Sequence, residues 1–113
     1  GEGGRREGRS FELEYLLSRL DEVGLRLTRF CSLKVLEEYR QTLGALIETA
    51  LKAMEVEREL RITRRGKEVL VVVREIDERV AKIASLIASR EADRVRITQL
   101  VEEIKGCVAD LLA

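Results

Sequence analysis

Histidine is missing from this sequence of 113 residues, and so are proline and tryptophan. Without an imidazole the chain cannot form a Ser-His-Asp or Cys-His catalytic arrangement, nor a metal site with histidine ligands. The absence of proline is typical of long, uninterrupted helices, because a proline inside a helix costs about 3 kcal/mol. The aromatic residues are only two phenylalanines and two tyrosines, which argues against binding nucleic acid by stacking bases on aromatic rings.

The chain also lacks net charge, since 21 basic residues balance 21 acidic ones. No global electrostatic field therefore draws it toward nucleic acid or anionic lipid. No apolar run approaches the roughly 20 residues needed to span a membrane, and no signal peptide is visible. We therefore expect a cytoplasmic protein without a membrane partner, and we disfavour nucleic acid as a partner.

Apolar residues are plentiful, at 45% of the sequence, and their spacing predicts helices. In residues 95–112 they recur every three or four positions, which places them on one stripe of a helix whose other face is polar. Such a helix is stable only when its stripe is buried against partners. The stripe consists of Ile97, Leu100, Val101, Ile104, Cys107, Val108, Leu111 and Leu112.

Three further segments show the same spacing and are the expected partners. We predict helices over residues 11–29, 33–56 and 67–88, with Ser10 and Ser32 as the N-caps of the first two. Residues 1–9 hold four glycines and are expected to be a flexible tail. The three stripes are Leu13, Leu16, Leu17, Leu20, Val23 and Leu27; Leu36, Tyr39, Leu43, Leu46, Ile47, Ala50, Leu51 and Met54; and Val69, Val72, Val73, Ile76, Val80, Ile83 and Ile87.

One stretch is ambiguous. The run of β-branched residues at 69–73 favours a strand, and a hairpin over residues 60–73 is an alternative to the helix. We favour the helix because its apolar stripe continues through Ile76, Val80 and Ile83. Residues 57–67 are read as the longest connection of the domain, between the second and third helices.

Four amphipathic helices with mostly short connections predict an all-α fold, an antiparallel up-and-down four-helix bundle formed by residues 10–113 as a single domain. In this layout Cys31 lies at the turn between the first two helices, at the end where the fourth helix begins. Cys107 then lies about 21 Å along the fourth helix, whereas a disulfide requires Cα atoms within about 7 Å. We therefore expect two free thiols, with Cys107 in the core.

Four segments carry a resemblance to a known family. SLKVLEEYR at 32–40, RRGK at 64–67, VREIDERV at 73–80 and VEEIKGCVADLLA at 101–113 resemble, in the same order and spacing, the YaaR-like family of small bacterial proteins of unknown function. The resemblance implies an all-helical cytoplasmic protein, and it brings no catalytic residue, metal or cofactor to carry over. One departure is Val35, which stands where an acidic capping-box residue is expected.

The best candidate site in the sequence is basic. Its arginines could bind a phosphate, a nucleic acid or an acidic protein surface, and a helix that begins just after Gly66 would add its N-terminus to the site. The alternative is a solvated loop whose arginines pair with neighbouring glutamates. The candidate anion- or partner-binding residues are Arg58, Arg61, Arg64, Arg65 and Lys67.

Asp77 and Gly106 also have predicted roles. Asp77 flanks an apolar stripe and is predicted to be partly buried in an ion pair with an arginine of a neighbouring helix. Gly106 stands beside the core position Cys107 and is predicted to permit close helix packing, with a groove for a partner helix as the alternative.

No arrangement of residues in the sequence predicts catalysis, a metal site or a cofactor site. We therefore expect a non-enzymatic helical-bundle protein that works as a protein-interaction or adaptor module, with a homodimer as one version of that interaction. The alternative is a nucleic-acid or phosphate-ligand binder that uses the basic segment 58–67.

Overall fold

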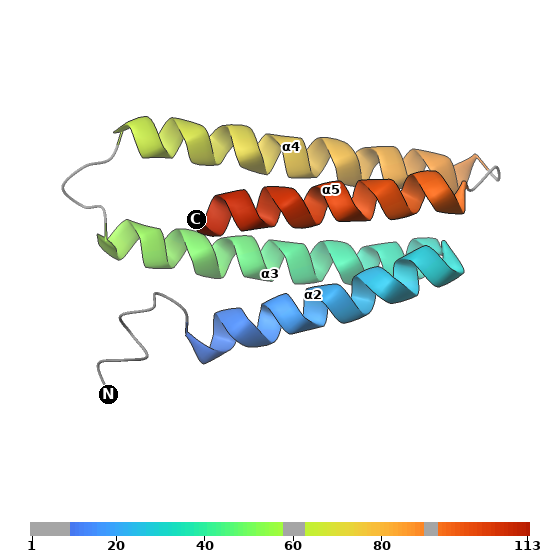
Figure 1. Cartoon of the computed structure of the whole chain (residues 1–113), viewed down its shortest axis with the longest axis horizontal. Coiled ribbons are helices and arrows are strands. Elements are labelled where there is room, and N and C mark those ends of the chain that lie inside the picture. Colours follow the sequence, from blue (N-terminus) through green and yellow to red (C-terminus); the bar gives the residue numbers. More distant parts are fainter. Residues whose placement is uncertain (1–9, 58–62, 90–92) are drawn as a thin grey trace.

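The computed structural model describes residues 10–57, 63–89 and 93–113, and within these ranges the chain forms four helices and no strand. The helices are α2 (Phe11–Phe30), α3 (Leu33–Glu57), α4 (Thr63–Ala88) and α5 (Arg94–Leu112). Each helix runs opposite to the one before it, and the four lie side by side along the long axis of the molecule (Figure 1). This confirms the predicted all-α, up-and-down bundle.

Serine side chains begin the first two helices, as the sequence predicts. The backbone N–H of Leu13 donates to Ser10 Oγ at 3.1 Å, and the N–H of Val35 donates to Ser32 Oγ at 3.2 Å. A side-chain cap of this kind satisfies one of the N–H groups that a helix leaves without an internal partner. A valine at the capping-box position therefore does not prevent Ser32 from capping α3.

The turn between α2 and α3 is sharp because Cys31 adopts a left-handed backbone conformation, with φ at 50° and ψ at 46°. Its N–H donates to the carbonyl of Leu27 at 2.8 Å, which closes the last turn of α2. Only Ser32 then separates this residue from α3. The two helices are thus forced to pack as antiparallel neighbours.

Helix α4 begins at Thr63, four residues earlier than the predicted start at residue 67. The β-branched run 69–73 is helical, so the hairpin alternative is wrong for residues 63–73, and residues 60–62 lie outside the described ranges. The helix prevails because its stripe is buried: Val69 is 8% exposed and packs with Ala50 and Leu111. Tertiary burial here outweighs the local preference for strand.

The core consists almost wholly of the predicted stripes. Its apolar residues are buried along the length of the bundle, and the removal of their surface from water stabilises the packing of all four helices. Among the residues whose burial is described, Val35 is the one buried apolar residue outside the predicted stripes. The residues less than 2% exposed with the largest side chains are Tyr39, Leu27, Leu46, Ile76, Ile83, Ile97, Leu100, Ile104, Leu111 and Val23.

Both cysteines are free thiols, as predicted. Cys107 is 8% exposed and belongs to the core cluster. Burial raises the pKa of this thiol, with a smaller contribution from nearby acidic groups such as Glu75. The group therefore behaves as a small apolar side chain rather than as a nucleophile.

The prediction that Gly106 permits close packing is wrong. The residue is exposed, and a Cβ atom built at this position meets no heavy atom within 4 Å. We expect Gly106→Ala to raise the free energy of unfolding by about 0.5–1 kcal/mol, because alanine loses less backbone entropy on forming a helix. Urea denaturation followed by circular dichroism measures this change. A decrease in stability would mean that the position is packed after all.

Candidate functional site

The bundle is built from two helical hairpins that pack closely inside and less closely against each other. The pairs α2–α3 and α4–α5 share long interfaces, whereas the contacts of α2 with α5 and of α3 with α4 are far fewer. The helices therefore follow one another around the bundle in chain order, and the seams α2–α5 and α3–α4 lie on opposite sides. Surface depressions follow both seams.

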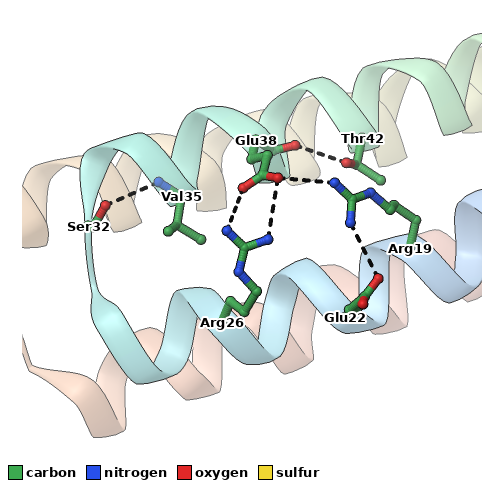
Figure 2. Close-up of polar contacts among 7 residues, drawn as sticks. All are labelled: Arg19, Glu22, Arg26, Ser32, Val35, Glu38 and Thr42. Atoms are coloured by element: carbon green, nitrogen blue, oxygen red, sulfur yellow. Dashed lines mark hydrogen bonds and ion pairs between the residues drawn. The ribbon is translucent and has the colours of Figure 1, made fainter.

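An ion pair network fastens the first hairpin. Glu38 of α3 accepts hydrogen bonds from Arg26 Nη2 at 2.8 Å and from Arg19 Nη2 at 3.0 Å, and Arg19 also pairs with Glu22 at 3.3 Å (Figure 2). Thr42, which is 8% exposed, donates its hydroxyl to the Glu38 carbonyl at 2.9 Å. Because its charged side chains pair with one another, this cluster has a structural role and holds α2 against α3.

The second hairpin has a similar fastener. Glu103 of α5 accepts a hydrogen bond from Arg79 Nε of α4 at 2.9 Å, and Arg96 Nη1 lies 3.7 Å from its other carboxylate oxygen. Across the α2–α5 seam, by contrast, the ion pair of Lys105 with Asp21 is longer, at 3.8 Å, and both side chains are 61% exposed. The ion pairs that join the two helices of each hairpin are thus shorter than the ion pair across the α2–α5 seam, which agrees with the closer packing inside the hairpins.

The Glu38 network makes a pH-dependent contribution to stability. Hydrogen bonding to Arg26 is the main cause that lowers the pKa of Glu38, and the charges of Arg26 and Arg19 lower it further. A lowered pKa stabilises the fold above the pKa that Glu38 has when unfolded, and this stabilisation is lost as pH falls through the folded value. We expect Glu38→Gln to be less stable than wild type near neutral pH.

The difference in stability should shrink steadily as pH falls below about 4, the ordinary range of a glutamate. Denaturant titrations of both proteins at a series of pH values measure it. A difference that stays constant down to strongly acidic pH would contradict a charged Glu38 in the folded state. Glu37→Gln is a matched control, since Glu37 is exposed and, among the described residues, its carboxylate makes no ion pair and accepts one hydrogen bond, from Gln41 at 3.4 Å.

The α2–α5 seam holds the candidate site. Two depressions, of about 290 and 470 Å³, share Leu20, Asp21 and Lys105 and so join into one groove, here called the α2–α5 groove. On α5 it extends from Thr98 to Leu112, a length of about 21 Å at 1.5 Å per residue. The remaining lining residues are Glu14, Leu17, Ser18, Gly24, Leu25, Thr28, Tyr39, Val101, Glu102, Val108 and Ala109.

The floor of the groove is apolar and is shaped by Gly24. This buried glycine lets α2 approach the two helices beside it, since a Cβ atom at this position would lie 3.4 Å from both Tyr39 Cε1 and Val101 Cγ1. From the sequence alone, Gly24 either permits a close approach of helices or is merely tolerated inside its helix, and the structure shows the close approach. Its signal in the sequence is weak, because a glycine inside a predicted helix is as often merely tolerated.

Tyr39 places one polar group at this floor. It is 1% exposed and lies on the predicted stripe of α3. Burial is the main cause that raises the pKa of Tyr39, and the charges of Asp21 and Glu102 raise it further, so the hydroxyl keeps its proton. Among the described residues its hydroxyl makes no hydrogen bond. The hydroxyl is therefore a buried donor that the rest of the described chain leaves without a hydrogen bond.

The rim of the groove is acidic. Glu14, Asp21 and Glu102 oppose a single basic residue, Lys105. Exposed apolar side chains extend the rim at one end: Leu25 is 72% exposed, and Val95, one turn before Thr98 on α5, is 67% exposed. An apolar floor between acidic edges is suited to an amphipathic, basic partner rather than to a small polar ligand.

The predicted basic site lies partly outside the described residues. Arg58 and Arg61 lie outside the described residues, while Arg64, Arg65 and Lys67 belong to the first turns of α4. Because α4 begins at Thr63, Gly66 lies inside the helix, and the expectation of a helix that starts just after Gly66 is wrong. Anion or partner binding by these five residues stays a prediction.

Asp77 differs from its prediction. The residue is exposed, and in the described part of the chain it makes no ion pair. Its position one residue after Ile76 turns it by about 100° from the core, toward the α3–α4 seam.

The described residues contain neither a metal-binding cluster nor a helix that could cross a membrane. Within the ranges 10–57, 63–89 and 93–113, no group of three or more cysteine, aspartate or glutamate residues is placed to hold a metal ion. In the same ranges no helix combines the length and the apolar character that crossing a membrane requires.

The comparisons with known proteins give one match. A family model described as a protein of unknown function, DUF327, matches residues 4–112, which is nearly the whole chain. This is consistent with the resemblance to YaaR-like proteins drawn from the four sequence segments. No curated protein and no solved structure matches the chain.

Proposed function

Because the chain belongs to DUF327, a family of proteins of unknown function, we propose its function from the geometry of the α2–α5 groove. The protein is a non-enzymatic protein-interaction module, and the groove binds an amphipathic helix of another protein. The observation that carries this proposal is the continuous apolar floor between α2 and α5. The non-enzymatic part rests on the sequence, which has no histidine and no recognisable catalytic arrangement.

The dimensions of the groove favour a helix as the occupant. Its length of about 21 Å matches about 14 residues of helix, which present four turns of side chains. A partner helix with apolar residues at positions i, i+3, i+4 and i+7 would lay them on Leu17, Val101 and Val108. The two supporting helices are each fastened to a neighbour, so the groove is rigid enough to bind without large rearrangement.

The charges of the groove favour a basic partner. Glu102 is exposed, and the acidic residues of the rim outnumber the basic one. Lysine or arginine residues that flank the apolar face of a partner would meet this rim and accelerate association.

A peptide probe tests the proposal. The probe is a fluorescent amphipathic peptide of about 15 residues, with leucines at helical spacing and lysines on the flanks. Fluorescence anisotropy should show saturable binding to wild-type protein, and Asp21→Lys combined with Glu102→Lys should weaken it by at least about tenfold, because like charges then meet at the rim. A peptide with glutamates in place of the lysines should bind more weakly than the basic probe.

Two controls distinguish binding in the groove from nonspecific binding of the peptide. A peptide of the same composition but with leucines at alternate positions should not bind, because its apolar residues cannot form one helical stripe. The protein variant Glu37→Lys with Glu48→Lys carries the same charge change on exposed positions of α3 away from the groove, and should bind as wild type does. Equal binding by the groove variant and wild type would refute the proposal.

The basic segment 58–67 supports the alternative function, a nucleic-acid or phosphate-ligand binder. Binding of a labelled single-stranded oligonucleotide, measured at rising salt, tests this alternative directly. A binder of this kind should lose affinity steeply with salt, and Arg64→Ala combined with Arg65→Ala should reduce the slope. If the oligonucleotide does not bind, or if the double variant binds as wild type does, the segment is a solvated connection.

A further inference from the structure

A second groove follows the α3–α4 seam, on the opposite side of the bundle from the α2–α5 groove. Its floor is apolar and is formed by Leu43, Ile47, Ile76 and Val80, around a depression of about 340 Å³. Its rims are Arg40 and Gly44 on α3, and Asp77 and Ala81 on α4. We call this surface the α3–α4 face.

The α3–α4 face carries opposite charges on its two rims. Arg40 and Asp77 are both exposed, and in the part of the chain that the structure describes no ion pair joins them to each other or to any other residue. A positive rim and a negative rim on the two sides of one apolar floor form a pattern that is complementary to itself. A matching surface would present its own negative rim to Arg40 and its positive rim to Asp77.

Apolar side chains extend the same face toward both ends. Leu33 stands seven residues before Arg40 on α3 and is 54% exposed, and Leu70 stands seven residues before Asp77 on α4 and is 70% exposed. Seven residues are close to two helical turns, so each leucine shares the face of its charged residue. Because α3 and α4 are antiparallel, the two leucines lie at opposite ends of the face (Figure 1).

Gly44 leaves room at the centre of the face. A Cβ atom at this position would meet nothing within 4 Å, although the residue lies in the middle of α3, where glycine costs about 1 kcal/mol relative to alanine. No described residue lies close enough to Gly44 to require a glycine here. A second backbone or side chain that packs onto the face would have the space that a larger residue would occupy.

We propose that the α3–α4 face binds the same face of a second copy of this chain, with a twofold axis along the groove. Such an axis lays α3 of one copy over α4 of the other at the same level. Arg40 of each copy then meets Asp77 of the other, which forms two equivalent ion pairs around the apolar floor. This proposal is independent of what occupies the α2–α5 groove.

The size of the face is sufficient for a stable dimer. α3 and α4 hold 25 and 26 residues, so each is about 38 Å long, and two helices side by side are about 20 Å wide. The flat outline of the face is therefore roughly 760 Å² per copy, of the same order as the roughly 800 Å² of accessible surface that each partner buries in a standard specific interface. The α2–α5 grooves would remain free on the two outer sides, so the dimer would be bivalent.

Charge reversal tests the proposed geometry. Sedimentation velocity of the full chain over a range of concentrations should show a monomer–dimer equilibrium for wild type. Arg40→Glu alone and Asp77→Lys alone should each weaken dimerisation by at least about tenfold, because each places two pairs of like charges in contact. Lys82→Glu, at an exposed position about 140° around α4 from Asp77 and outside the groove lining, is the matched control and should dimerise as wild type does.

Mixing the two variants gives the decisive result. In a mixed dimer, the negative charge introduced at position 40 of the first variant faces the positive charge introduced at position 77 of the second. The native Asp77 of the first variant faces the native Arg40 of the second. The mixture should therefore form heterodimers although neither variant dimerises alone. Wild-type protein that is monomeric at every concentration would overturn the proposal. So would a dimer that both single variants retain, or a mixture that stays monomeric. None of these results bears on peptide binding in the α2–α5 groove, which is measured separately.

Discussion

Truncation of Tyr39 to alanine is expected to lower the free energy of unfolding by about 3–5 kcal/mol, which is the range for removing a large aromatic side chain from a core. The side chain is 1% exposed, and its Cε1 atom would lie 3.4 Å from a Cβ atom at Gly24, between α2 and α5. A globular domain has only about 5–15 kcal/mol of stability in total. Tyr39→Ala should therefore shift the midpoint of urea denaturation strongly, and it could abolish folding.

Tyr39→Phe should behave differently, because it removes only the hydroxyl. Since that hydroxyl makes no hydrogen bond among the described residues, we expect the free energy of unfolding to stay the same or to rise by up to about 1 kcal/mol. The phenylalanine variant should bind the basic peptide probe about as wild type does, because the ring is kept and the lost hydroxyl is buried. A loss of more than about 1 kcal/mol of stability would show that the hydroxyl has a partner inside the protein.

The same comparison explains how much of the fold could be predicted from sequence. The recurrence of Ile97, Leu100 and Ile104 at three- and four-residue spacing fixes which face of α5 is buried, and all three are 0% exposed. Burial of such a stripe is the main stabilising contribution to a helix in a bundle. Periodicity therefore predicts the helices and the core, and the short connections between the helices predict their antiparallel order.

Periodicity predicts less well for residues that flank the stripe. Gly106 is next to Cys107 in sequence, but it lies about 100° away around the helix and faces solvent. Asp77 has the same relation to Ile76 and is exposed. Val35 shows the reverse error, because its place after the cap of α3 obscured its burial at 7% exposure. Residues adjacent in sequence do not share a helix face, because each residue turns the direction of the side chain by about 100°.

The α2–α5 groove could not be predicted, because it depends on the distance between two hairpins. Asp21, Leu25 and Thr28 form a second row beside the stripe of α2, and Thr98, Glu102 and Lys105 do so on α5. Each row reads as an ordinary solvated face when taken alone. Only the looser contact of α2 with α5 turns the two rows into the sides of a groove. The basic segment, in contrast, was conspicuous in sequence and has no described side-chain geometry to support it.

Two leucines of α2 should separate stability from recognition. Leu27 is 0% exposed in the core, whereas Leu25, two residues earlier, is 72% exposed at the rim of the α2–α5 groove. Leu27→Ala is expected to lower the free energy of unfolding by about 2–5 kcal/mol, through lost burial and the cavity left behind. Leu25→Ala should change it by no more than about 0.5 kcal/mol, as is usual for an exposed position.

Binding of the basic peptide probe should show the opposite order. Leu25→Ala should weaken binding, because it removes apolar surface from the rim of the groove, whereas Leu27→Ala should bind with nearly wild-type affinity at temperatures where it remains folded. Denaturant titration and fluorescence anisotropy on the same two variants provide the comparison. If Leu25→Ala changed neither quantity, the exposed leucine would be an ordinary surface residue, and the groove would have to bind its partner through the floor alone.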